Sequence, residues 1–132
     1  MNNEFKQTFI NDKEQLEKHA EYYSDKKFIS KSKRVGKNLG FKTLSAATTL
    51  FAALKSKEMS KSNKLVVLGA LGYFILPVDL VADFLPLVGL SDDAFIILAA
   101  LGKVYSSITD EMKEEGKQMA EKMMRKKYEI PD

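Results

Sequence analysis

Apolar residues recur at helical spacing along most of the chain. Leu16, Ala20 and Tyr23 share one helical face, and Asn11 and Asp12 just before them are suitable capping residues. A longer apolar stripe follows at steps of mostly three or four, through Val35, Leu39, Leu44, Ala47, Phe51 and Leu54. This second stripe predicts one long helix that begins somewhere between residues 25 and 36.

A third helix and a turn are predicted in the middle of the chain. Ser60 is a suitable N-cap for a helix that ends at Leu76, because Pro77 disfavours helical backbone at the residue before it. Asp79 then begins a short helical turn. Residues 86–90 are expected to form a loop.

Two further helices complete the pattern. Ser91 is expected to cap a fourth long helix over residues 92–108, and Thr109 or Asp110 opens a last helix that ends near Tyr128. The apolar stripe of this last helix consists of Met112, Gly116, Met119 and Met123. The methionines are expected to lie in the core.

The expected fold class is all-α. With no hairpin signal and no internal repeat, the economical architecture is one domain over residues 1–132, a single bundle of about five helices. Helices within residues 11–55 come first, a central helical hairpin around an Asp/Pro-rich turn follows, and an amphipathic helix over residues 110–128 closes the bundle. Gly69 and Gly72 are expected to let two helices pack closely.

Composition and charge restrict the chemistry. The 132 residues include no cysteine and one histidine, which excludes disulfides, thiolate zinc sites and multi-histidine centres. Charge is segregated, because residues 31–64 hold nine Lys or Arg and one Glu within a chain of net charge +3. Such a local excess favours an anionic partner.

Asp, Pro and Gly residues occur at a characteristic spacing between residues 70 and 93. The set is Ala70, Tyr73, Pro77, Asp79, Leu80, Asp83, Pro86, Gly89, Asp92 and Asp93. This segment resembles the YkvA-like family, or domain of unknown function 1232, and the likeness extends over about residues 60–105. Ala82 departs from the pattern, since the family usually has proline there. The resemblance implies a helical, membrane-associated protein of a family that is bacterial and wider, and it implies no biochemical activity.

Four carboxylates in this apolar segment require partners, because buried charges persist only when paired or hydrogen-bonded. In the preferred interpretation, Asp79 caps a short turn, Asp92 and Asp93 lie in the first turn behind Ser91, and Asp83 is a second cap or the partner of a basic residue. No cofactor is then needed. In the alternative, Asp79, Asp83, Asp92 and Asp93 bind Mg²⁺ or Ca²⁺ and support hydrolysis or phosphoryl transfer.

Four lysines surround the predicted start of the third helix, beside the apolar residues 65–76. Lys55, Lys57, Lys61 and Lys64 are expected to contact an anionic membrane surface, while a solvated face and a protein partner remain alternatives. Nucleic acid is disfavoured, because residues 31–64 contain one Arg against eight Lys and offer few free aromatic rings.

The expected function is a non-enzymatic helical interaction module or membrane-peripheral module, with the metal site as the alternative. The apolar residues 65–76 would form a helix about 18 Å long, too short to cross a hydrocarbon core of about 30 Å. They would lie in the core or dip shallowly into a membrane. No secretory signal precedes them, so the expected location is the cytoplasm or the cytoplasmic face of the membrane.

Overall fold

The computed structural model describes the backbone of residues 8–76 and 86–128 and the side chains of residues 8–76 and 93–125. The elements are α2 (Lys13–Ala20), α3 (Asp25–Leu39), α4 (Phe41–Lys55), α5 (Lys61–Ile75), α6 (Pro86–Val104), the 3₁₀ helix η2 (Tyr105–Ser107) and α7 (Asp110–Tyr128). All of these elements are helical, so the predicted all-α class is confirmed for the described residues. They comprise six α-helices and one 3₁₀ helix, rather than about five helices.

Three predicted helix starts are confirmed by capping hydrogen bonds. In each case a side-chain oxygen accepts from the backbone N–H three residues later, which satisfies one of the free donors of the first turn. The bonds join Asp12 to Gln15, Ser60 to Asn63 and Thr109 to Met112, at 3.2, 3.1 and 3.1 Å. Capping signals are local, so the sequence identifies them directly.

The predicted long second helix is instead two helices that meet at Gly40. The backbone of Gly40 has φ +86°, a conformation that glycine adopts readily and other residues rarely do. Its N–H donates to the carbonyl oxygen of Gly36 at 3.0 Å, which closes the end of α3. The apolar stripe continues on both sides of this break, and for that reason the pattern alone suggested one helix.

The predicted start of the fourth helix is wrong, because α6 already begins at Pro86. Proline suits the first position of a helix, since the N–H that it lacks would have no partner there. Residues 86–90 are therefore helical rather than a loop. At its other end, α6 stops at Val104 and gives way to η2 before Ile108. The predicted turn at Asp79 lies outside the described residues.

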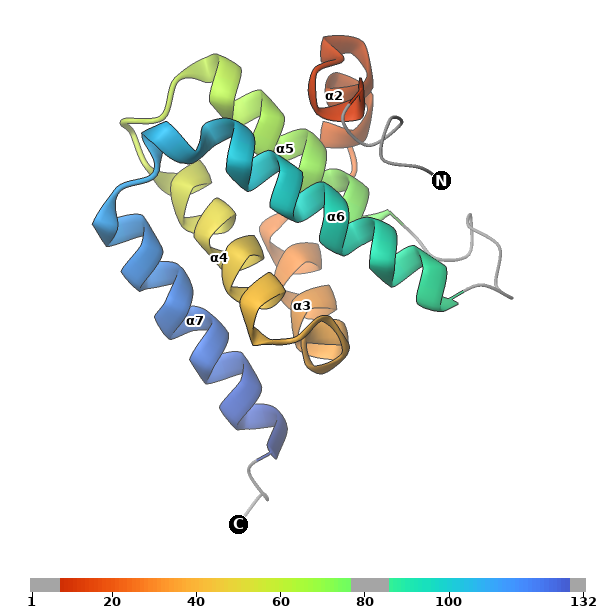
Figure 1. Cartoon of the computed structure of the whole chain (residues 1–132), viewed down its shortest axis with the longest axis vertical. Helices are drawn as coiled ribbons and strands as arrows, with labels where there is room; N and C mark the ends of the chain where they lie inside the picture. Colours follow the sequence, from red (N-terminus) through yellow and green to blue (C-terminus); the bar gives the residue numbers. More distant parts are fainter. Residues whose placement is uncertain (1–7, 77–85, 129–132) are drawn as a thin grey trace.

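The helices pack in a bundle in which α4 lies along α7 and α2 packs against α5 (Figure 1). Helix α6 runs beside α5 and crosses α4, so α5 and α6 form the predicted central hairpin (Figure 1). Fully buried side chains from four helices meet between them, namely Phe28, Leu50, Val67, Leu71, Phe74, Ile96, Ile97 and Val104. Met112 and Met123 are also buried, as predicted.

Close contact between α2 and α5 depends on two glycines. A Cβ atom on Gly72 would lie 2.7 Å from the carbonyl carbon of His19, and one on Gly69 would lie 2.9 Å from the Cα of Leu16. No side chain fits at either distance without movement of the backbone. The predicted role of these glycines in helix packing is confirmed.

Candidate functional site

The structure describes the four predicted acidic residues to different extents. Asp79 and Asp83 lie outside the described residues, and of Asp92 only the backbone, within α6, is described. Asp93 is described fully and has 6% of its surface exposed. Because α6 begins at Pro86, Asp92 and Asp93 lie inside the helix rather than in its first turn, so the predicted capping role of these two residues is wrong.

Asp93 forms a buried ion pair with Lys31 of α3. The Lys31 Nζ lies 3.2 Å from Asp93 Oδ2, and the two side chains are 8% and 9% exposed. The same Nζ also donates to the carbonyl oxygen of Phe74, at the end of α5, and lies 4.8 Å from the centroid of the Phe74 ring. A single ammonium group thus joins α3, α5 and α6. One of the nine basic residues within residues 31–64 is therefore buried rather than exposed at the surface.

This pairing bears on the metal alternative. A cation beside the Asp93 carboxylate would also lie beside the Lys31 ammonium, and the repulsion would oppose its binding. Within the described ranges, no group of three or more His, Cys, Asp or Glu side chains is arranged to hold a metal ion. The four-carboxylate Mg²⁺ or Ca²⁺ site as a whole stays a prediction, because two of its members are not described.

The four predicted surface lysines do not form a uniform cationic surface. Lys55 is paired with Asp25, whereas Lys57 and Lys61 are exposed and Lys64 is half-buried. Acidic side chains lie beside Lys55, in a hollow between α4 and α7 that Glu58, Glu111 and Glu115 also line. At this end of the bundle, positive and negative charges are mixed.

The Asp25–Lys55 pair includes Tyr23. The Tyr23 hydroxyl donates to Asp25 Oδ1 at 2.5 Å, and Lys55 donates to the other carboxylate oxygen. These hydrogen bonds, that from Lys55 first, hold the pKa of Asp25 below its usual value. Burial and the neighbouring carboxylate raise the pKa of the Tyr23 phenol.

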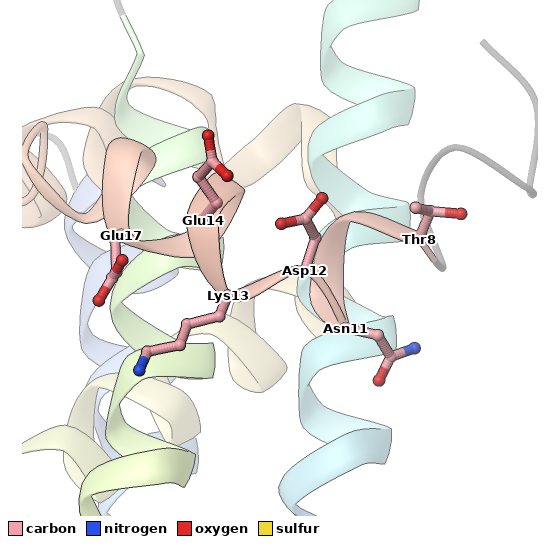
Figure 2. A pocket seen from close by; sticks show the side chains of 6 residues that line it. All are labelled: Thr8, Asn11, Asp12, Lys13, Glu14 and Glu17. Carbon is pink, nitrogen blue, oxygen red and sulfur yellow. The ribbon is translucent and has the colours of Figure 1, made fainter.

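An open acidic hollow surrounds the start of α2 (Figure 2). Its lining residues are Thr8, Asn11, Asp12, Lys13, Glu14 and Glu17. Figure 2 shows that the carboxylates of Asp12, Glu14 and Glu17 point in different directions, and Asp12 is already engaged in capping α2. These carboxylates do not converge on a common ligand.

A different surface combines apolar and cationic groups around the outer side of α6. Leu98 of α6 and Tyr105, the first residue of η2, are 41% and 54% exposed. With Leu101 of α6 they follow at steps of three and four, which places the three side chains on one side of the chain where α6 passes into η2. We call these three residues the α6 outer stripe. A helix that is apolar on every side is normally buried, so the exposed side of α6 is a candidate surface for binding a partner.

A hollow of about 320 Å³ lies beside the α6 outer stripe, between α4, α6 and α7. We call it the α4–α6–α7 hollow, and its lining residues are Lys42, Ser45, Ala46, Thr49, Leu98, Leu101, Tyr105, Ile108, Lys113 and Lys117. Its cations come from two helices, because Lys42 belongs to α4 while Lys113 and Lys117 lie one turn apart on α7. The described lining contains no carboxylate.

A second hollow of about 460 Å³ lies on the other side of α6, between α2, α5 and α6. Its lining residues are Ile10, Asn11, Lys13, Leu16, Lys61, Ser62, Leu65, Val66 and Lys103. Here too three lysines surround an apolar floor, and the described lining has no acidic group. Lys103 donates to the side-chain oxygen of Asn11, which ties α6 to the start of α2.

Only one of the lysines that line the two hollows beside α6 belongs to the lysine group predicted from the sequence. Lys61 belongs to the predicted lysine group, but Lys42, Lys113 and Lys117 are far from one another in sequence and only the packing of α4 against α7 brings them together. The available signal was the apolar character of residues 94–101 on all sides of a helix, which left one face without an obvious neighbour.

Comparisons with known proteins find one partial match, to a family of unknown function. Neither the curated proteins nor the solved structures contain a match to the chain. Within the described ranges, no helix combines the length and the apolar character needed to cross a membrane. Residues 63–99 match the family described as "Protein of unknown function (DUF1232)", which confirms the predicted resemblance to domain of unknown function 1232 over this segment of the chain.

Proposed function

We propose that the protein is a non-enzymatic module that binds the surface of an anionic membrane through the outer side of α6. The observation that carries this proposal is the exposed α6 outer stripe, which lines a hollow together with three lysines and no described carboxylate. A second hollow with three lysines lies on the other side of α6. Its expected location is the cytoplasmic face of the membrane.

The two kinds of group support binding in different ways. Each lysine near an anionic leaflet contributes about 1 kcal/mol, and this attraction weakens as salt screens it. Leu98 and Tyr105 add apolar surface that can enter the boundary between head groups and acyl chains, where tyrosine is favoured. The combination resists salt better than charge alone.

Flotation with liposomes tests the proposal. The wild-type chain is expected to float with anionic vesicles and not with neutral ones at about 0.1 M salt, and to remain partly bound at about 1 M salt, where the Debye length is about 3 Å. Absence of flotation with anionic vesicles contradicts the proposal. Complete loss at high salt contradicts the role of the apolar stripe.

A tryptophan probe identifies the surface in contact, because the chain contains no tryptophan of its own. Leu98→Trp places the probe on the α6 outer stripe. Ser30→Trp places a matched probe at an exposed position of α3, in a hollow that Lys26, Lys33 and Arg34 also line. We expect anionic vesicles to shift the emission of the first variant to shorter wavelength and to leave the second unchanged. The reverse result assigns the contact to α3 and contradicts the proposal.

The same assay tests the lysines around the connection between α4 and α5, which the sequence predicted as the membrane contact. Neutralising Lys57, Lys61 and Lys64 to Gln removes three charges, of which only Lys61 lines a hollow beside α6. We expect a modest loss of flotation and no change in the Leu98→Trp emission shift. Complete loss of both would place the contact at the α4–α5 end.

A further inference from the structure

We infer that the α4–α6–α7 hollow binds one anionic phospholipid, with the phosphate on Lys42, Lys113 and Lys117 and the first acyl methylenes on the α6 outer stripe. This inference rests on the proposed function and adds a defined lipid site to it. Charge complementarity supports this occupant, because the described lining supplies three cations and no carboxylate around an apolar wall.

The apolar part of the wall comes from two helices and from the connection between η2 and α7. Leu98 and Leu101 project from α6, Ala46 from α4, and Ile108 lies between η2 and α7. Ala46 and Ile108 are buried, while Leu98 is 41% exposed, so the wall continues from the core to the surface. A free phosphate ion would contact only the rim, whereas a lipid also covers the wall.

One cation of the rim, Lys113, contacts Tyr105. The Lys113 Nζ lies 3.1 Å from the Tyr105 hydroxyl and 4.8 Å from the centroid of the Tyr105 ring. This hydrogen bond raises the pKa of Lys113 above its usual value. Tyr105 is therefore a positioning residue that keeps Lys113 at the mouth of the hollow. Lys117 follows one turn later on the same side of α7.

The size of the hollow limits what it can hold. At about 320 Å³ it lies at the small end of ligand pockets, which range from about 300 to 1,000 Å³. A head group with a few methylenes fits this space, while a complete diacyl lipid does not. The rest of the lipid would stay in the bilayer, and the site would hold α6 against the membrane.

A soluble short-chain lipid separates this site from general attraction to the membrane. We would titrate ¹⁵N-labelled protein with dihexanoyl phosphatidylglycerol below its micelle concentration and follow backbone amide shifts by NMR. Saturable shifts are expected at Ala46, Leu98, Tyr105 and Lys117. Dihexanoyl phosphatidylcholine and inorganic phosphate should give weaker shifts, the first for lack of net charge and the second for lack of acyl chains.

Paired variants test the residues. Lys42→Gln/Lys117→Gln should raise the Kd of the soluble anionic lipid by about tenfold or more, since two of its three cations are lost. Lys18→Gln/Lys27→Gln removes the same charge from exposed positions of α2 and α3, and should leave the Kd within about twofold. Tyr105→Leu should weaken lipid binding more than Tyr105→Phe, which retains the aromatic ring. The melting temperature of each Tyr105 variant should stay within a few degrees of that of the wild type.

Each outcome supports or overturns the inference. Saturable shifts confined to the hollow support it, as does a Kd that the hollow pair raises and the control pair does not. Wild-type flotation without saturable shifts overturns the lipid site and leaves the proposed function intact. Equal loss with both lysine pairs shows general charge attraction and also overturns it. Failure of the wild type to float overturns the proposed function itself, whatever the soluble lipid does.

Discussion

Removing the carboxylate of Asp93 leaves the Lys31 ammonium buried beside an uncharged neighbour. The two charged atoms lie 3.2 Å apart and their side chains are less than a tenth exposed, so water cannot replace the lost partner. At an effective dielectric constant of about 20, their direct attraction is about 5 kcal/mol. Desolvation offsets much of that attraction in the intact pair, but not when one charge remains alone.

We therefore expect Asp93→Ala and Lys31→Met each to lower the free energy of unfolding by about 3–5 kcal/mol. For a chain of this size, whose total stability is expected to be about 5–15 kcal/mol, that is a large share. Lys31→Met also removes the donor to the Phe74 carbonyl oxygen, so its loss should be at the upper end. The double variant Lys31→Met/Asp93→Leu should fall within about 2 kcal/mol of the wild type, because no buried charge is left.

Urea denaturation followed by circular dichroism at 222 nm measures these differences. The exposed pair Lys55–Asp25, with side chains 52% and 46% exposed, provides the matched control, and Lys55→Met should cost no more than about 1 kcal/mol. If a single variant is too unstable to fold, the double variant still tests the reasoning. A double variant whose loss equals the sum of the two single losses would refute it.

Three further predictions concern stability. Gly72→Ala should lower the free energy of unfolding, measured by urea denaturation, by about 3 kcal/mol or more, because the added methyl group meets the backbone of His19. Gly102→Ala, which places its methyl where no atom lies within 4 Å, should raise the free energy of unfolding by about 0.5–1 kcal/mol. Equal effects would contradict the close packing of α2 on α5. Ser32→Ala should be neutral or stabilising by up to about 1 kcal/mol in the same assay, because its fully buried hydroxyl has no hydrogen-bond partner among the described residues; a loss above 1 kcal/mol would show that a partner exists. The lowered pKa of Asp25 contributes stability that is present above the usual carboxyl pKa of about 4 and is lost as the pH falls through the lowered value. The wild type should therefore lose more stability than Asp25→Asn between pH 5 and about pH 2. Parallel plots of unfolding free energy against pH for the two proteins would contradict this prediction.

Local signals in the sequence determined where three of the six described α-helices begin. Asp12, Ser60 and Thr109 act on backbone groups three residues away, so their effect does not depend on the rest of the fold. The methionine stripe of α7 and the close packing at Gly72 also follow from short spacings. Where two local signals competed, the pattern failed, since Gly40 interrupts a continuous apolar stripe and Pro86 can begin a helix as well as precede a loop.

Only the tertiary structure decided which charges are buried and which apolar groups are exposed. Lys31 and Asp93 are 62 positions apart. The apolar surroundings of Asp93 indicate that its carboxylate needs a partner, but nothing near either residue in the sequence identifies the other as that partner. Leu98 likewise has the sequence surroundings of a core residue, yet 41% of its surface is exposed. Burial depends on which helices pack together, and that choice depends on the summed contacts of the whole chain rather than on any short segment.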